Sequence, residues 1–383
     1  MTHVARGDGI DLVRRMVRID SRNPSLVPGA PGELALATFL RDALASWGLD
    51  ARLQEAAPGR PNVIATLRGS GGGRSLMFNG HLDVVGVDGM THAPFDAEEK
   101  GGRVYGRGAS DMKGGVAAMC AAAARLGGQL KGDVVITAVV DEEWQSIGTA
   151  ALIAAGIRAD AAVVTEPTRL GFMPAHKGFA WLQAILHGRA AHGSRWDIGI
   201  DAIRHAGLLL SELDRVDRDE LPRRRHALLG RPSLHASSIE GGIGLSTYPD
   251  RCVVRIERRT IPGETADDAV REIRAACERV RSAVPELEVE VDLLFAQPPS
   301  DVEPDAPIAK VLTSVIAAQR LDATPFGMSA WTDAALLNAA GIPAVCFGPG
   351  DMGLAHAAEE YIDLDEIERA TETLAALATA WCN

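Results

Sequence analysis

Histidine and acidic side chains that could bind a metal ion follow several expected strands of this 383-residue chain. His81-x-Asp83 comes directly after the short apolar stretch Leu76–Phe78. Side chains two apart on extended backbone point to the same side, so we expect Asp83 beside His81. There its carboxylate would accept the proton of the ring nitrogen that does not ligate, which orients a metal-bound imidazole. H-x-D is a common pattern, and taken alone it fits a histidine in a surface loop better than a metal ligand. The metal interpretation therefore depends on the later stretches that supply the remaining ligands.

Further candidate ligands lie at the ends of expected strands or in polar and glycine-rich loops: Asp111, Glu142, Glu143, Glu166 and His356. The carboxyl ends of parallel strands share one edge of a sheet, where ligands usually bind. Four acids gathered there would repel each other, and two divalent cations would balance their charge. Nitrogen and oxygen donors without cysteine fit zinc or cobalt.

The adjacent pair Glu142-Glu143 suggests two different roles. Neighbouring side chains on extended backbone point apart, so one can face a metal while the other faces substrate. A carboxylate that does not ligate, placed beside water acidified by the metals, would act as general base. The alternative is that Asp141-Glu142-Glu143 caps the helix expected at 146–155 and fills its acidic first turn. This fragment alone does not separate the two interpretations.

The order of expected elements indicates an α/β fold with an insertion. Strands and helices alternate, and the uninterrupted β-branched run 133–140 is typical of a central strand in a mostly parallel sheet flanked by helices. From about residue 178 the order becomes β-α-β-α-β, which indicates a smaller α+β domain. We therefore expect a catalytic domain at 1–177 and 294–383, and an inserted domain at 178–293.

Composition excludes several classes of function. The net charge of −12 argues against binding to nucleic acid or to an anionic membrane surface. The five cysteines include no C-x-x-C, which indicates reduced thiols in the cytoplasm. There is no apolar signal core and no uncharged apolar run of about 18 residues. The glycine cluster 69–73 lacks the phosphate-binding pattern G-x-x-x-x-G-K-[ST]. We expect a cytoplasmic protein with a small-molecule substrate.

Eight stretches, in order, resemble a known family: G-H-L-D-V-V, G-R-G-A-S-D-M-K-G-G, D-E-E, T-E-P, H-K-G, G-R-A-A-H-G-S, E-R-R-T-I-P-G-E and G-P-G…A-H-A-A-E-E-Y. The family comprises the dinuclear-zinc metallohydrolases that include acetylornithine deacetylase, succinyl-diaminopimelate desuccinylase, aminoacylase and glutamate carboxypeptidase. The resemblance implies a zinc-exopeptidase-like fold, two divalent metal ions per chain, and a homodimer in which 178–293 is the lid and dimerisation domain.

The resemblance also implies a metal-binding role for five residues. Asp111 would bridge both metals. One metal would be completed by His81 and Glu166, and the other by Glu143 and His356.

Five more residues gain expected roles in the same way. Glu142 would be the general base and Asp83 the partner of His81. His192 resembles the histidine that reaches across the dimer to polarise the scissile carbonyl. Arg259 matches the arginine that holds the substrate carboxylate, which suits a guanidinium fork. Ser246 stands where some members have the asparagine of Asn-x-x-Pro, which contacts substrate.

The expected activity is hydrolysis of the amide bond of an N-acyl amino acid, as in acetylornithine deacetylase. Ala330-Trp331-Thr332-Asp333 replaces the Gly-Thr-Ser-Asp-Gly of the desuccinylase and argues against that assignment. Glu166 in T-E-P is typical of the deacetylase and carboxypeptidase branches. A dipeptidase or glutamate-type carboxypeptidase is the alternative. A non-catalytic small-molecule-binding homologue is a more distant one, because no ligand or base is missing.

Overall fold

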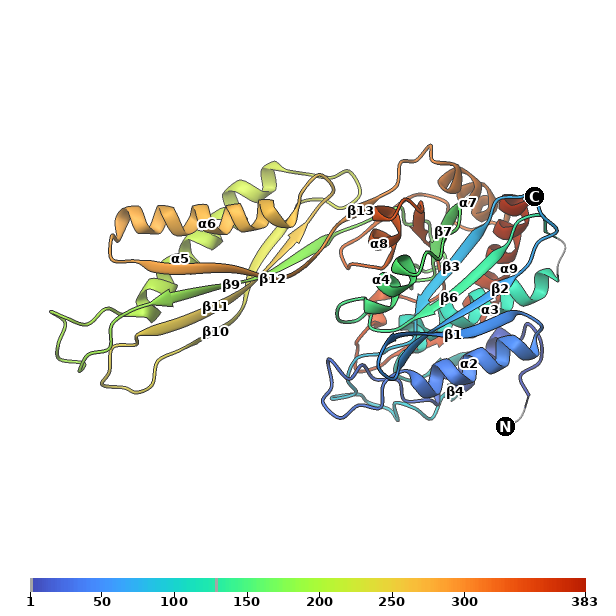
Figure 1. The fold of residues 1–383 in the computed structure, drawn as a ribbon, viewed down its shortest axis with the longest axis horizontal. Helices are drawn as coiled ribbons and strands as arrows, with labels where there is room; N and C mark the ends of the chain where they lie inside the picture. The colour runs from blue at the N-terminus through green and yellow to red at the C-terminus, as the bar shows by residue number, and fades with distance from the viewer. Residues whose placement is uncertain (1–2, 128–129) are drawn as a thin grey trace. The chain divides into compact units, whose positions relative to one another are not determined.

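The computed structural model describes residues 3–127 and 130–383, which form two compact units (Figure 1). Unit 1 consists of three segments: Met1–Pro174, Val302–Phe326 and Thr332–Asn383. Unit 2 consists of two segments: Ala175–Asp301 and Gly327–Trp331. The sequence pattern placed the inserted domain at 178–293 and did not indicate the short second segment of unit 2.

Unit 1 is built on a six-stranded sheet whose strands lie in the order β1 (Asp50–Ala57), β2 (Arg60–Leu67), β6 (Val134–Val139), β3 (Leu76–His81), β7 (Ala161–Val164) and β15 (Ala344–Cys346). Strands β6, β3, β7 and β15 pair in parallel, whereas β1 and β2 are antiparallel at one edge. Every residue of β3 is buried, as expected for a strand covered on both faces. The predicted α/β class with a mostly parallel sheet is confirmed.

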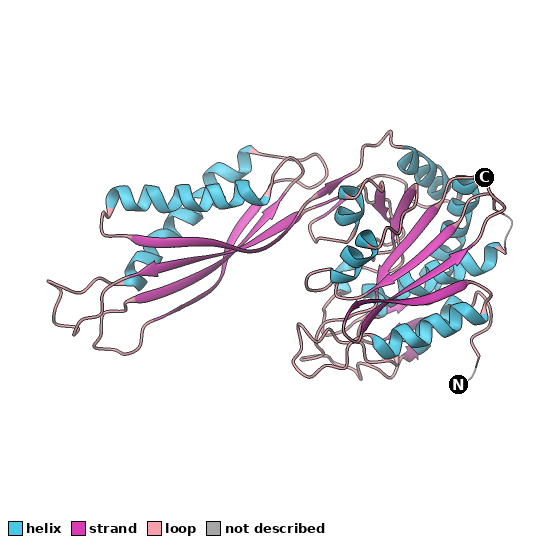
Figure 2. Cartoon of the chain, in the orientation of Figure 1, coloured by secondary structure: helices cyan, strands magenta, loops and turns pink. Residues whose placement is uncertain are grey.

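Helices cover both faces of this sheet (Figure 2). The helices of unit 1 are α1 (Gly9–Val17), α2 (Leu34–Ser46), α3 (Gly114–Leu126), α4 (Ile147–Ala154), α7 (Pro307–Ala318), α8 (Ala334–Ala339) and α9 (Leu364–Cys382). Successive residues of β2 divide between two cores: Val63 belongs to the large core that includes residues of α2, α3 and α9, whereas Ile64 belongs to a smaller core with Leu152 of α4. Among the described residues, no helix combines the length and the apolar character needed to cross a bilayer.

Unit 2 contains a four-stranded antiparallel sheet in the order β10 (Ser233–Gly241), β11 (Arg251–Thr260), β9 (Gly178–His187) and β12 (Glu288–Gln297). Helices α5 (Ala202–Arg215) and α6 (Ala266–Ala283) share one core with this sheet. The observed order β-α-β-β-α-β corrects the predicted β-α-β-α-β, which lacked β10. That strand lies at the sheet edge and is mostly exposed, so it lacks a clear apolar alternation.

Short strands complete both units. In unit 1, β4 (Glu98–Lys100), β5 (Arg103–Tyr105) and β16 (Tyr361–Asp363) form an antiparallel sheet. In unit 2, β8 (Ala175–His176) pairs with β13 (Ser300–Asp301) and with β14 (Gly327–Met328). The pairing of β14 with β8 explains why the second segment belongs to unit 2.

Candidate metal centre

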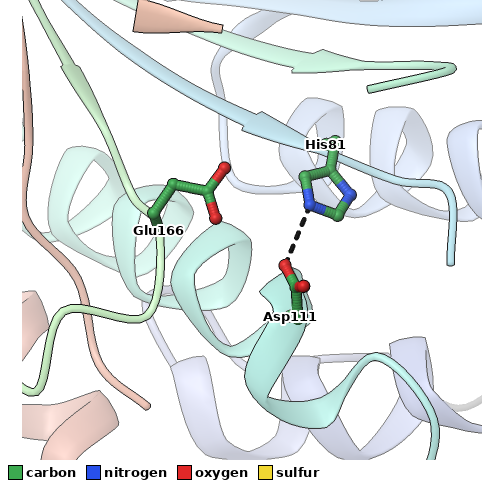
Figure 3. A group of neighbouring side chains, drawn as sticks. All are labelled: His81, Asp111 and Glu166. Atoms are coloured by element: carbon green, nitrogen blue, oxygen red, sulfur yellow. Dashed lines mark hydrogen bonds and ion pairs between the residues drawn. The ribbon is translucent and has the colours of Figure 1, made fainter. Parts of the chain in front are cut away.

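The ends of two neighbouring strands bring the first group of candidate ligands together. His81 ends β3, and Glu166 follows β7, which pairs with β3 in parallel. Asp111 lies in the turn that leads into α3. One ligand atom from each of these three buried residues lies within 4.8 Å of the others. In Figure 3 the carboxylates of Glu166 and Asp111 both point toward the His81 ring, whose Nε2 is 3.1 Å from Asp111 Oδ1.

A second group shares Asp111 with the first. Its members are Asp111, Glu143 and His356, and their ligand atoms also lie within 4.8 Å of one another. Nε2 of His356 is 2.9 Å from Glu143 Oε2 and 3.5 Å from Asp111 Oδ2. Asp111 therefore turns Oδ1 toward one group and Oδ2 toward the other. This is the arrangement that a carboxylate bridging two cations requires.

The electrostatics of the two groups fit divalent cations. Burial raises the pKa of Glu142 and Glu166 well above the usual range, and neighbouring carboxylates add to this effect. Burial alone would lower the pKa of His81, but its hydrogen bond to Asp111 and the nearby acids raise it. Glu143 Oε1 is buried without a hydrogen-bond partner. Two cations would balance these carboxylates and occupy that oxygen, and the nitrogen and oxygen donors suit zinc or cobalt.

Glu142 lies beside the first group without belonging to it. Its side chain is 10% exposed, and its Oε2 is 4.0 Å from His81 Nε2. From there a carboxylate can reach water beside a cation without binding the cation itself. The alternative interpretation of Asp141-Glu142-Glu143 as a helix start is wrong, because α4 begins at Ile147 and has no acid in its first turn.

Asp83 lies near His81, but its carboxylate does not make the predicted hydrogen bond to the His81 ring. His81 Nδ1 lies 2.9 Å from the carbonyl oxygen of Asp83 and 3.8 Å from its carboxylate. The carbonyl therefore accepts the ring proton and leaves Nε2 facing Asp111. The carboxylate is occupied elsewhere, because it accepts from the backbone N–H of Glu142 at 3.1 Å and of Glu143 at 3.2 Å. Asn23 Nδ2 donates to it at 2.8 Å.

A buried polar network continues from Asp83, and our sequence analysis did not identify it. Asn23 Nδ2 also donates to Asp141 Oδ1 at 3.1 Å, and Arg60 Nη1 donates to the same oxygen at 2.7 Å. Arg60 Nε in turn donates to Glu33, which is fully buried, at 3.0 Å. The network holds the turn that carries Glu142. Only the break at Asn23-Pro24 and the position of Asp141 in D-E-E could have signalled it.

Asp333 is a further buried acid near the centre. Thr149 Oγ1 donates to Asp333 Oδ2 at 2.7 Å, whereas Oδ1 is buried without a hydrogen-bond partner. Burial raises its pKa to about 6, although the hydrogen bond from Thr149 and the nearby Ser146 hydroxyl group favour the charged form. In the sequence, Asp333 stands out only as the end of the stretch Ala330-Trp331-Thr332-Asp333, which differs from the desuccinylase pattern.

The remaining predicted residues lie in unit 2, whereas both ligand groups lie in unit 1. His192 is exposed, and its loop joins that of Ser246 through a hydrogen bond of 2.7 Å from Gly193 N to Ser246 O. Arg259 lies on β11 with its guanidinium 5.3 Å from the centre of the Phe179 ring. Its Nη2 is paired with Glu257 at 2.7 Å. The roles of His192, Ser246 and Arg259 stay predictions.

Comparison with known proteins gives a consistent result. A family model described as Peptidase family M20/M25/M40 matches residues 77–380. Acetylornithine deacetylase of Myxococcus xanthus is 30% identical over 335 residues, which are 86% of this chain and 86% of that protein. A probable succinyl-diaminopimelate desuccinylase of Staphylococcus epidermidis is 27% identical over 399 residues, 95% of each chain.

A solved structure shares the fold. The YXEP protein of Bacillus subtilis, described as a dinuclear metal-binding peptidase from the M20 family, has a TM-score of 0.74 at 17% identity. The match covers 97% of this chain and 96% of that one. Because the family model matches most of the chain, the chain belongs to peptidase family M20/M25/M40 and is a hydrolase of amide bonds.

Proposed function

We propose that this chain is a deacylase that hydrolyses the amide bond of an N-acyl amino acid and needs two divalent cations. The observation that carries the proposal is the pair of ligand groups that share Asp111, with Glu142 beside them but outside both. The similarity to proteins named acetylornithine deacetylase and succinyl-diaminopimelate desuccinylase supports an N-acylated amino acid as substrate. We also propose that the chain acts as a homodimer in the cytoplasm.

The residues present would hold the cations in two places. His81 and Glu166 would bind one, Glu143 and His356 the other, and Asp111 both. When bound, zinc or cobalt supplies Lewis-acid polarisation of the carbonyl and lowers the pKa of water. Glu142 removes the proton from the water that attacks the scissile carbonyl and returns it to the leaving amine. The carboxylate of Asp83 keeps Glu142 in position by accepting a hydrogen bond from the backbone N–H of Glu142.

Three residues of unit 2 would act on the substrate. His192, supplied by the second copy of the chain, donates a hydrogen bond to the oxyanion that develops on the carbonyl oxygen. Arg259 holds the substrate carboxylate with its two-pronged guanidinium, in exchange for the pairing with Glu257. Ser246, on the loop next to that of His192, contacts the substrate.

A substrate screen tests the proposal. Metal-free protein is reconstituted with zinc or with cobalt and assayed for release of free amine from N-acetyl, N-succinyl and N-formyl amino acids and from dipeptides. We expect hydrolysis of one N-acyl class, none without cation, and none by Glu142→Ala with cations bound. Faster hydrolysis of dipeptides would establish the peptidase alternative instead. Binding of these compounds without hydrolysis would make the chain a non-catalytic binding protein.

A further inference from the structure

Glu360 is a fully buried carboxylate to which the proposed chemistry gives no role. It lies between His356 and β16, and its side chain accepts four hydrogen bonds. Oε2 accepts from Arg107 Nη1 at 2.7 Å and from Gly108 N at 3.0 Å. Oε1 accepts from the backbone N–H of Ser110 and of Asp111, both at 3.1 Å. Both oxygens therefore act only as acceptors.

Three of these four donors belong to the backbone segment 108–111, which ends at Asp111. The backbone of Asp111, with φ −119° and ψ 94°, is not helical, so regular helical hydrogen bonding does not fix its position. A buried carboxylate is costly unless its hydrogen bonds are made. Glu360 therefore favours the one conformation of the segment that presents all three N–H groups. That conformation places Asp111 where it belongs to both ligand groups.

The backbone of Glu360 is also held on both sides. Its N–H donates to His92 Nε2 at 3.2 Å, and its carbonyl accepts from Gly106 N at 3.0 Å. Four residues earlier in the same loop, His356 has a left-handed backbone (φ 60°) and belongs to no helix or strand. Glu360 thus joins the segment that carries Asp111 to the segment that carries His356. These are two of the three residues in the second ligand group.

We propose that Glu360 is a positioning residue: by fixing Asp111 relative to His356, it sets the affinity of the Asp111–Glu143–His356 group for its cation. The inference rests on the proposed binding of two cations but not on the identity of the substrate. The pair formed by Glu360 and Arg107 is then part of the metal centre and does more than stabilise the fold.

The test is cation binding by Glu360→Gln. Glutamine has the same shape, but its NH2 group meets N–H donors where a carboxylate oxygen had accepted. Loss of a partner that orients metal ligands typically weakens metal binding about 10–100-fold. Cobalt titration of the metal-free protein, followed by the absorption spectrum and by competition with a chelator, should show this loss for one of the two ions. The other ion, at the His81 group, should change less.

The control for a purely structural role is Glu264→Gln in unit 2. Glu264 is also a buried carboxylate that accepts from an arginine, Arg258 Nη2 at 2.9 Å, and from a backbone N–H, Ile261 N at 3.0 Å. This variant should bind both cobalt ions as the wild type does, even where it unfolds at a lower temperature. Glu359→Gln changes the exposed neighbouring residue and should also bind both cobalt ions with the affinity of the wild type.

The outcomes separate the inference from the proposed function. Unchanged affinity for both ions in folded Glu360→Gln overturns the inference and leaves the deacylase proposal intact. The inference is also overturned if Glu264→Gln shows the same loss of cobalt affinity as Glu360→Gln. If Glu360→Gln does not fold, Glu360→Asp is measured instead, because it keeps the charge and shortens the reach; wild-type affinity there also overturns the inference. Wild-type protein that binds two ions but hydrolyses nothing refutes the deacylase proposal alone.

Discussion

Replacing Asp83 with asparagine should impair Glu142 rather than remove the cation held by His81. In the structure, the ring of His81 is hydrogen-bonded to the carbonyl of Asp83, which every substitution retains. The carboxylate instead accepts from the backbone N–H of Glu142 and Glu143. Asparagine leaves one oxygen for these donors and presents an NH2 group to the other. The turn that carries Glu142, the proposed general base, therefore loses a hydrogen-bond acceptor, while the His81 imidazole keeps its own.

The expected fall in kcat of Asp83→Asn can be calculated from the hydrogen bonds that are lost. A hydrogen bond to a charged group contributes about 1.5–3 kcal/mol, and Asp83→Asn weakens at least one of the two backbone bonds. If that energy holds Glu142 in place, kcat should fall roughly 10–150-fold, since about 1.4 kcal/mol is tenfold. This loss does not exceed the roughly 10²–10⁴-fold that general-base catalysis contributes, as expected if Glu142 is displaced but still present. Because the carboxylate is fully buried, the free energy of unfolding should fall by a similar amount.

The assay combines three measurements on Asp83→Asn: cation content, steady-state kinetics on the best substrate of the screen, and urea unfolding. We expect two cations per chain, a lower kcat and a KM close to that of the wild type. Asp83→Ala should lose more kcat, because no acceptor remains. Our reasoning is refuted if Asp83→Asn loses a cation and regains full kcat when excess zinc is supplied. That result would mean that the carboxylate acts through His81 after all.

Three further predictions concern other residues. Glu142→Ala should bind two cations and lose roughly 10²–10⁴-fold in kcat, whereas Glu143→Ala should lose a cation; metal analysis would reveal a reversed pair. His192→Ala mixed with Glu142→Ala should regain activity in heterodimers, and verified heterodimers that stay inactive would exclude a role across the dimer. Burial lowers the pKa of His176 from 6.5 to about 4. As pH falls, this side chain is therefore protonated in the unfolded chain before it is protonated in the folded chain. The free energy of unfolding should decrease as pH falls from about 6.5 to about 4. In urea unfolding of the metal-free protein, the free energy of unfolding of His176→Asn should fall by about 3 kcal/mol less than that of the wild type over this pH range. An equal dependence on pH in the two proteins would contradict the prediction.

The closeness of the candidate ligands His81 and Glu166 was predictable, because it follows from sheet topology. His81 and Glu166 end two strands that the apolar runs indicated, and parallel neighbours place their carboxyl ends together. Asp111 and His356 lie in loops whose positions sheet topology does not fix, so their residue types made them candidates and only the family resemblance assigned each one to a metal. The edge strand β10 was missed because a mostly exposed strand shows little apolar alternation. The β1–β2 hairpin at the edge of the large sheet was not predicted as a hairpin for a related reason, since β1 is nowhere fully buried.

The partners of Asp83 and Glu360 could not be predicted from spacing. Asp83 meets the Glu142 backbone because Asp141 adopts a left-handed conformation (φ 70°), which aspartate permits but does not require. Glu360 is separated from Asp111 by 249 positions, and nothing in the letters E-E-Y shows which acid is buried. In both cases the carboxylate binds backbone N–H groups, which every residue type except proline provides. The residue that donates such a hydrogen bond can be of any type but proline, so the sequence does not reveal which residue it is.

The division of the chain suggests how binding of cations and action on substrate are separated. The five residues of the two candidate ligand groups lie in unit 1, as do the buried carboxylates of Asp83 and Glu360. His192, Ser246 and Arg259 lie in unit 2. Substitutions at these three positions should therefore change kcat or KM while both cations stay bound. Substitutions at Glu360 should change cation affinity first and activity only as a consequence. A unit 2 variant that folds yet loses a cation would show that the two tasks are not separated in this way.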